Sequence, residues 1–251
     1  MKYLTSEEIL NEKSEEAHEI LEKCTGKSVR DNFAFKVFDA YLEKGFGNNK
    51  HNLKILDLGP ASGGFAKQIN DSGYVNIYGA DLDDYRIDIN KKSFKEFKKC
   101  DLSWEKIPWS DGSFDVADAW CILPHLENPF FCVREIARVL KTGGVFIFTA
   151  PFLASKPSRD YFVKYGDFGS YKASNNHLVL FPPGVVEKSV LKYFDILGIE
   201  YHFRTKIFNG WKGQIRKIVF RIFKRMGDGW RKKIARRWAY NIFYILKKKE
   251  L

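Results

Sequence analysis

Short apolar runs alternate with helical segments through the middle of the chain. Four runs are each too short, and too rich in β-branched and aromatic residues, for a helix, and they predict buried strands: residues 54–59, 75–81, 114–120 and 144–150. A weaker run at 97–102 is a further strand candidate. Strands that alternate with helices indicate a parallel sheet covered on both faces, so the predicted fold class is α/β.

Helical segments are predicted on both sides of these strands. Residues 1–50 are predicted to form an N-terminal helical cap, because segment 6–23 is weakly amphipathic and a second helix is expected at 32–43. The helix before the fourth strand has clear end signals: Asn128 is suited to cap its start, with proline in the first turn. The double glycine at 143–144 is expected to end it.

The C-terminal half has a different pattern. Residues 151–181 are rich in aromatics but show no strong period, which predicts a lid or substrate loop. A helix at 183–194 and a strand at 199–208 are expected to follow. The run 239–246 predicts the last strand.

The composition fits one large domain over residues 1–251. With 45% hydrophobic residues the chain can bury a sizeable core. It has neither a secretory leader nor a run of about 18 apolar residues, so we expect a cytoplasmic protein. The four cysteines lack CxxC or zinc-like spacing. That spacing predicts reduced thiols in or near the core, and no metal site.

Positive charge is concentrated near the C-terminus. The net charge of +11 consists of +12 over residues 211–251 and −1 over the remainder. Residues 210–238 predict a basic, amphipathic helical insertion before the last strand. Three partners fit residues 211–238: an anionic membrane surface, tRNA or another nucleic acid, and a second subunit. The membrane surface suits the aromatics that are interleaved with the basic residues. It would make the protein peripheral to the inner face of a membrane.

A glycine-rich turn links the first strand to the helix after it, in KILDLGPASGGFAKQI, residues 54–69. Gly59 and Gly63 remove side chains where backbone must approach a ligand, and Asp57 can orient the loop or accept from a ligand ammonium group. NAD and S-adenosylmethionine (SAM) both suit such a crevice. Since NAD needs a glycine where Ala61 stands, close to its pyrophosphate, the turn favours SAM.

Two aspartates follow at the ends of the next two predicted strands. Asp81, 18 positions after Gly63, can accept hydrogen bonds from both ribose hydroxyls of either cofactor. Asp101 can accept from the adenine amine, while the backbone of Leu102 meets the ring edge. Each aspartate alone is more typical of a turn. Together with the glycine turn they indicate one nucleotide site.

From these residues onward the sequence resembles the class I SAM-dependent methyltransferases, in particular the branch related to ubiquinone and menaquinone biosynthesis methyltransferases. The resemblance covers about residues 52–208 and is strongest over 107–151, where Phe114-Asp115 opens a strand and Arg138-Val139-Leu140 leads to the double glycine. It implies a Rossmann-like, seven-stranded, mostly parallel sheet with one antiparallel edge hairpin and helices on both faces. The basic helices would be an insertion in that fold.

Carried over by position, the resemblance implies where SAM would lie. Its methionine part would lie along Asp57, Gly59, Ala61 and Gly63. Its ribose would contact Asp81 and Leu82, and its adenine would contact Asp101 and Leu102. Trp120 would lie beside the sulfonium and the substrate. The sequence departs from the family at Ala61, where glycine is usual, and at Thr142, where proline often precedes the double glycine.

Methyl transfer requires a nucleophile in line with the carbon–sulfur bond, and such positioning supplies roughly 7–11 kcal/mol. A hydroxyl acceptor also needs a base. His125 and His177 are the candidates, since histidine is the commonest base, although each could instead be a turn or packing residue. We therefore expect a methyltransferase acting on a hydroxyl of a small molecule or glycan, including a lipid-linked one. An RNA (tRNA) methyltransferase and a non-catalytic SAM-fold adaptor, binding membrane or nucleic acid, are the alternatives.

Overall fold

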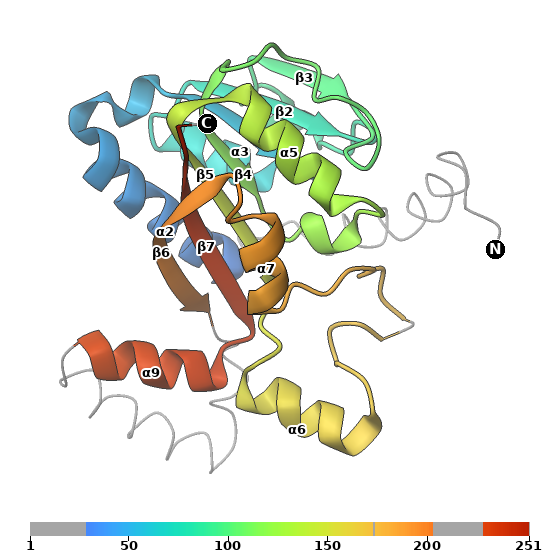
Figure 1. The fold of residues 1–251 in the computed structure, drawn as a ribbon. Helices are drawn as coiled ribbons and strands as arrows, with labels where there is room; N and C mark the ends of the chain where they lie inside the picture. The colour runs from blue at the N-terminus through green and yellow to red at the C-terminus, as the bar shows by residue number, and fades with distance from the viewer. Residues whose placement is uncertain (1–28, 173, 203–227, 251) are drawn as a thin grey trace.

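In a computed structural model of the chain, the described residues are 29–172, 174–202 and 228–250. They form one seven-stranded sheet in the order β3-β2-β1-β4-β5-β7-β6 (Figure 1). The strands are β1 Lys54–Leu58, β2 Asn76–Asp81, β3 Glu96–Lys99, β4 Phe114–Ala119, β5 Leu140–Pro151, β6 Phe194–His202 and β7 Asn241–Lys248. Strands β1 to β5 pair in parallel, and β7 runs antiparallel to both β5 and β6. The predicted mixed sheet with an antiparallel edge is confirmed.

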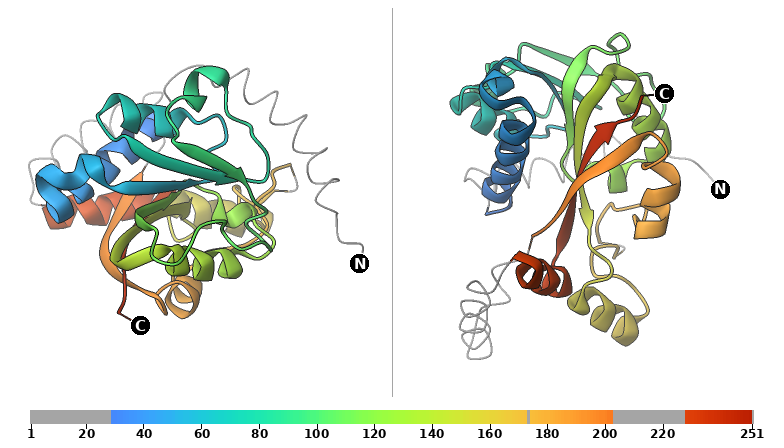
Figure 2. Two further views of the ribbon diagram at one scale, coloured as in Figure 1. Left: turned by 90° about the horizontal axis from the view of Figure 1, so that it is seen from above. Right: turned by 60° about the vertical axis from the view of Figure 1, so that its left-hand side comes forward.

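Helices cover both faces of this sheet. Helices α2 and α3 lie on one face, and α5 and α7 lie on the other (Figure 2). The helical elements are α2 Val29–Phe46, η1 Gly47–Asn52, α3 Gly64–Asp71, α4 Asp88–Lys91, η2 Leu123–His125, α5 Pro129–Val139, α6 Lys156–Tyr165, α7 Pro183–Ser189 and α9 Asp228–Trp238. Because both faces are covered, the central strands are apolar at successive positions, which is why the strand pattern was readable in the sequence.

Helix α5 begins where the sequence predicts and ends earlier. The Asn128 side chain accepts a hydrogen bond from the Phe131 amide (3.2 Å), as expected for an N-cap. The helix ends at Val139, not at the double glycine, because Leu140 is already extended and pairs with Phe114 in the sheet. Gly144 lies inside β5, where an added Cβ would be 2.8 Å from a backbone oxygen.

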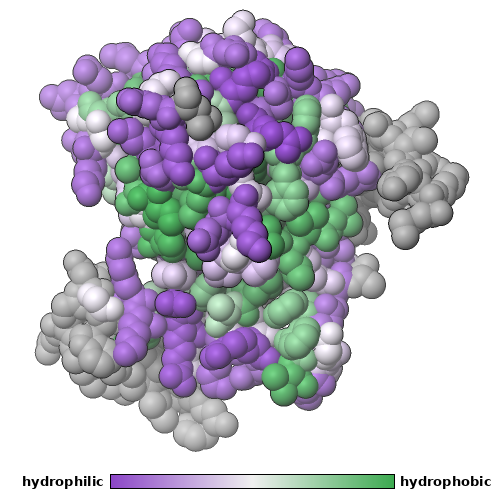
Figure 3. Space-filling model, viewed as in Figure 1, coloured by the Kyte–Doolittle hydropathy of each residue, from purple (hydrophilic) through white to green (hydrophobic). Residues whose placement is uncertain are grey.

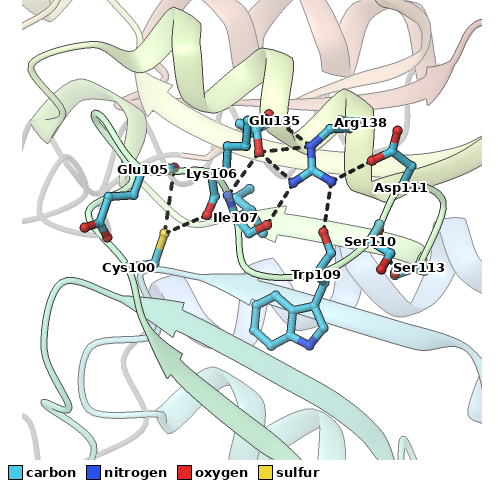
Figure 4. Close-up of polar contacts among 10 residues, drawn as sticks. All are labelled: Cys100, Glu105, Lys106, Ile107, Trp109, Ser110, Asp111, Ser113, Glu135 and Arg138. Atoms are coloured by element: carbon cyan, nitrogen blue, oxygen red, sulfur yellow. Dashed lines mark hydrogen bonds and ion pairs between the residues drawn. The ribbon is translucent and has the colours of Figure 1, made fainter.

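Glu135 and Arg138 of α5 hold the loop between β3 and β4 in place (Figure 4). The Arg138 guanidinium donates to the Glu135 carboxylate (2.7 Å) and to the carbonyl oxygens of Ile107 (2.8 Å) and Trp109 (2.9 Å). It also pairs with Asp111 at 2.7 Å. Glu135 in turn accepts from the Ile107 amide at 3.0 Å. This network gives Arg138 of the Arg138-Val139-Leu140 motif a structural role. The part of the loop that the network fixes follows Asp101 and Leu102, the residues predicted to hold the adenine.

The expected loop at 151–181 contains a helix, α6, that the sequence did not predict. Its side chains are not buried, so its apolar residues form no core-facing stripe. The predicted helix at 183–194 is shorter, ending at Ser189. Of the two predicted basic helices, α9 is present, and the other lies outside the described residues, as does the predicted helix at 6–23. Within the described ranges, no helix has the length and apolar character that a bilayer span requires.

Candidate functional site

The predicted cofactor residues meet at one edge of the sheet. Strand β1 pairs with β2 and β2 with β3, all in parallel, so their carboxyl ends lie side by side. The Gly59 amide donates to the Ala80 carbonyl (2.8 Å) and the Cys100 amide to the Asp81 carbonyl (2.8 Å), which aligns the three strand ends. The glycine turn, Asp81 and Asp101 therefore follow three neighbouring strands at a single edge.

The glycine turn has the left-handed backbone that its sequence suggests. Gly59 has φ +68° and Gly63 has φ +76°. A Cβ on Gly59 would lie 2.7 Å from the side chain of Ile122, so the turn packs closely against the segment after β4. Ala61, the departure from the family pattern, also has a positive φ of 46°. Alanine therefore keeps the conformation that glycine would adopt there, with a strain of roughly 1–2 kcal/mol.

Asp81 holds this turn. One carboxylate oxygen accepts from the Ala61 amide (3.2 Å) and the other from the Leu82 amide (2.8 Å). The side chain is 9% exposed. The loop-orienting contact that the sequence suggested for Asp57 is thus made by Asp81 in this structure.

Asp57 is instead buried beside a second aspartate. It lies directly opposite Asp118 in the β1–β4 pair, and both side chains are buried. Burial, with the charge of Asp81, raises the pKa of Asp57 to about 7, and the neighbouring carboxyl of Asp118 opposes part of this rise. Burial and the charge of Asp57 raise the pKa of Asp118 well above its usual value. Two adjacent buried carboxyls cannot both ionise cheaply, so this pair retains a proton near neutral pH.

Asp101 lies at the predicted strand end in a tight turn. Its carboxylate accepts from the Ser103 amide at 2.9 Å, and its own amide donates to Glu105 at 2.8 Å. The side chain is half-buried, while that of Leu102 is in the core. The adenine contacts predicted for these two residues stay predictions.

Trp120 follows β4 and packs against the helix that begins at the glycine turn. Its ring centroid is 4.6 Å from that of Phe65 in α3 and 5.9 Å from that of Phe243 in β7. This contact places Trp120 next to the start of α3. Its predicted position beside a sulfonium group stays a prediction.

The two histidines proposed as bases lie together, although they are 52 positions apart in the sequence. Their ring centroids are separated by 4.4 Å. His125 Nδ1 is 3.1 Å from the Asn176 carbonyl oxygen, and His177 Nδ1 is 2.5 Å from that of Ser170. Burial lowers the pKa of His177, an effect that the Ser170 contact opposes. The neutral imidazole is therefore favoured at this position.

Sequence reasoning missed two residues near this edge, Asp118 and Cys121. The alternation of Val116, Asp118 and Trp120 along β4 could have placed Asp118 on the face of the sheet that carries Asp57. Cys121 is the second residue after the same strand, but its approach to His177, with 3.8 Å between Sγ and Nε2, joins positions 56 apart. No spacing rule for cysteine and histidine would have found that contact.

The comparisons with known proteins identify the domain. The profile of a methyltransferase domain matches residues 56–148, which contain the glycine turn, Asp81, Asp101 and the Arg138 network. The chain carries a class I SAM-dependent methyltransferase domain.

Relatives of this methyltransferase domain act on different acceptors, as their names state. The chain is 29% identical over 139 residues to cycloartenol-C-24-methyltransferase 1 of Oryza sativa subsp. japonica, covering 52% of this chain and 39% of that protein. It is 28% identical over 106 residues to a sarcosine/dimethylglycine N-methyltransferase of Halorhodospira halochloris, covering 40% and 38%. The matched part is thus less than half of each relative. The predicted ubiquinone and menaquinone branch stays a prediction.

Solved structures share the fold of the methyltransferase domain over most of the chain. A putative methyltransferase in complex with the Trm112 activator of Haloferax volcanii gives a TM-score of 0.55 at 14% identity, covering 85% of this chain and 96% of that one. The PH0226 protein of Pyrococcus horikoshii OT3 gives 0.53 at 17%, covering 88% and 92%. The cyclase SpnF gives 0.50 at 18%, covering 78% and 74%. At these identities the likeness shows the fold alone.

The site fits SAM, the cofactor of this family. The glycine turn offers a close approach of backbone, and Asp81 has the carboxylate that ribose hydroxyls require. Beside it, the Tyr85 hydroxyl is buried and has no hydrogen-bond partner within the described part of the chain. Burial and the charges of Asp81 and Asp83 raise the pKa of Tyr85 to about 12. A buried hydroxyl of this kind is costly, so a polar ligand next to Asp81 would satisfy it.

Proposed function

We propose that the methyltransferase domain transfers a methyl group from SAM to a hydroxyl of a small-molecule or glycan acceptor, including a lipid-linked one, at the cytoplasmic face of an anionic membrane. The observation that carries the proposal is the meeting of the glycine turn, Asp81 and Asp101 at one sheet edge. Ligands of open α/β sheets bind beyond the carboxyl ends of the strands.

On the donor side, each residue has a binding task. The 59–63 turn lies along the methionine part, Asp81 accepts from the ribose hydroxyls, and Asp101 accepts from the adenine amine. When bound, SAM supplies a methyl group that its sulfonium makes electrophilic. The protein's contribution is then alignment of the acceptor and exclusion of water.

On the acceptor side, His125 and His177 would accept the proton that the hydroxyl loses when it is methylated. A carbonyl oxygen only accepts, so the contacts of His125 and His177 place the proton of each neutral ring on Nδ1. The Nε2 lone pair is then the atom that takes a proton. We infer that the acceptor hydroxyl lies beside these two rings, next to Ile122 and the glycine turn.

Two helices at one end of the molecule support a membrane-bound acceptor. Helix α6 contacts α9, and hydrophobic surface over α6 lies near hydrophilic surface over α9 (Figure 3). The apolar side chains of Phe162, Val163 and Tyr165 are 45–86% exposed on α6, while Arg236 and Arg237 are exposed on α9. Exposed apolar side chains next to cationic ones suit a surface of anionic lipid.

The first experiment measures cofactor binding by isothermal titration with SAM and with NAD. We expect SAM to bind, and Asp81→Asn to weaken it by about 10- to 100-fold, since a hydrogen bond to a charged group is worth about 1.5–3 kcal/mol. Asp88→Asn is the matched control, because the Asp88 side chain is 98% exposed. Binding of NAD in preference to SAM would contradict the proposal.

The second experiment identifies the acceptor class. SAM with a labelled methyl group is incubated with the protein and with separate lipid, glycan and RNA fractions, and sedimentation with phosphatidylserine vesicles is measured in parallel. We expect label in the lipid or glycan fraction and vesicle binding that weakens in Arg236→Glu/Arg237→Glu. Label in RNA would favour the RNA methyltransferase. SAM binding with no transfer to any fraction would favour the adaptor.

A further inference from the structure

Cys121, His125 and His177 form a compact cluster at the end of β4. One ligand atom from each residue lies within 4.8 Å of the other two. The Cys121 Sγ is 3.8 Å from His177 Nε2. A thiol and two imidazoles form a donor set of one sulfur and two nitrogens, which borderline-soft ions such as Zn²⁺ prefer and which Mg²⁺ and Ca²⁺ do not.

Both imidazoles are oriented as metal ligands usually are. Each ring directs Nδ1 at a backbone carbonyl, Asn176 for His125 and Ser170 for His177. That contact fixes the tautomer with the proton on Nδ1 and leaves the Nε2 lone pair as the donor atom. A hydrogen bond from the non-ligating nitrogen to a carbonyl is the usual support of a metal-bound histidine, since it orients the ring and increases its basicity.

The backbone around the cluster is held in an uncommon conformation. Cys121 has φ +63°, a left-handed value that is rare for a residue other than glycine. Such strain costs on the order of 1–3 kcal/mol and is concentrated at functional sites. The amides of Leu178 and Val179 both donate to the Pro124 carbonyl, at 2.7 and 3.1 Å. These two bonds fix the segment that carries His177 against the turn that carries His125.

We propose that Cys121, His125 and His177 bind one zinc-type transition-metal ion and leave its fourth coordination position open. With Zn–S near 2.3 Å and Zn–N near 2.0 Å, tetrahedral geometry separates sulfur from nitrogen by roughly 3.5 Å, close to the 3.8 Å between Cys121 and His177. Small rotations of side chains would close the remaining distance. Sites with three protein ligands are typical of catalytic zinc, whose fourth position takes water or substrate.

The position of the cluster connects it with methyl transfer, and this step rests on the proposed function. Ile122, next to Cys121, contacts Gly59 of the donor turn. A hydroxyl or thiol acceptor at the open position would release its proton to solvent. Its oxygen or sulfur lone pair would then form the bond to the methyl carbon, while the carbon–sulfur bond of SAM breaks and its electron pair stays on sulfur. With the metal bound, the histidines would act as ligands in place of the proton-accepting role given above, and the metal would lower the pKa of the acceptor.

The test is titration of the metal-free full chain with Co²⁺, whose visible absorption reports tetrahedral coordination and thiolate ligation. We expect one equivalent to bind with a sulfur-to-cobalt charge-transfer band. Cys121→Ser should abolish this band, and His177→Asn should weaken binding at least about 10-fold. Cys100→Ser and His51→Gln, at positions outside the cluster, should change neither, and circular dichroism verifies that each variant is folded. Absence of the band, or its persistence in Cys121→Ser, would overturn the site.

A chelator experiment separates the metal site from the proposed function. Dipicolinate should abolish transfer of labelled methyl groups, Zn²⁺ should restore it, and SAM affinity by calorimetry should be unchanged throughout. If the chain binds cobalt through Cys121 but does not bind SAM, the metal site is supported and the proposed function is contradicted. Transfer that is insensitive to chelation in a protein verified as metal-free would remove the catalytic part of the inference.

Discussion

Replacing Arg138 by methionine is expected to destabilise the protein by about 3–5 kcal/mol. The substitution keeps an apolar stem and removes the guanidinium, so Glu135, which is 7% exposed, is left as a buried charge without its cation. Loss of one partner of a buried ion pair costs about this amount. The contact with Asp111 adds little, because that side chain is 80% exposed.

The assay is urea unfolding followed by tryptophan fluorescence and extrapolated to water. Adding Glu135→Gln to Arg138→Met should recover most of the loss, because the neutral amide oxygen can still accept from Ile107 and no unpaired charge remains. Asp111→Asn is the control and should change the free energy of unfolding by less than about 1 kcal/mol. A loss below about 1 kcal/mol in Arg138→Met, or an equal loss in the double variant, would refute the role of this network.

Three further predictions concern the cofactor edge. The folded Asp57 carboxyl has a pKa of about 7, so between pH 5 and 7 it is largely protonated while the same carboxyl in the unfolded chain is ionised. The contribution of Asp57 to stability is therefore greatest at low pH and falls as pH rises; Asp57→Asn should reduce the loss of stability over this range, measured by urea unfolding, by roughly 2 kcal/mol, and an unchanged loss would contradict it. Gly59→Ala should lower the free energy of unfolding by at least about 1 kcal/mol, because alanine is strained in the left-handed conformation. It should also weaken SAM binding, because its Cβ would displace Ile122. Full SAM affinity in this variant would argue against the turn as the donor site. Tyr85→Phe should raise the free energy of unfolding of the ligand-free protein by about 1 kcal/mol or more, because it removes a buried hydroxyl without a partner in the described part of the chain, but it should reduce SAM affinity in calorimetry. Equal affinity would mean that the Tyr85 hydroxyl is not a ligand contact.

The strands of the sheet could be predicted because short-range sequence features mark them. Strands buried on both faces read as apolar runs, and glycine turns and strand-end aspartates lie at fixed places beside them. Asn128 as a helix cap was readable for the same reason. The double glycine gave the wrong end for the helix, because Leu140, three positions before Gly143, is already paired in the sheet. Nothing within the helix itself encodes that pairing.

The features that the sequence did not reveal depend on tertiary contacts. Helix α6 was missed because its apolar residues face outward, with Val163 86% exposed, so no amphipathic period marks it. Asp118 was overlooked because its importance comes from register with Asp57 in a neighbouring strand. The cluster of Cys121 with His177 is created by hydrogen bonds from the 178–179 segment to Pro124. Such long-range pairings are not visible in residue spacing.

A crystal structure with bound S-adenosylhomocysteine tests the account most directly. The account predicts the ribose within hydrogen-bonding distance of Asp81, the adenine amine beside Asp101 and the amino-acid part along the 59–63 turn, with the sulfur directed toward Cys121 and the two histidines. A ligand bound elsewhere, or at this sheet edge without contact to Asp81, would contradict this placement.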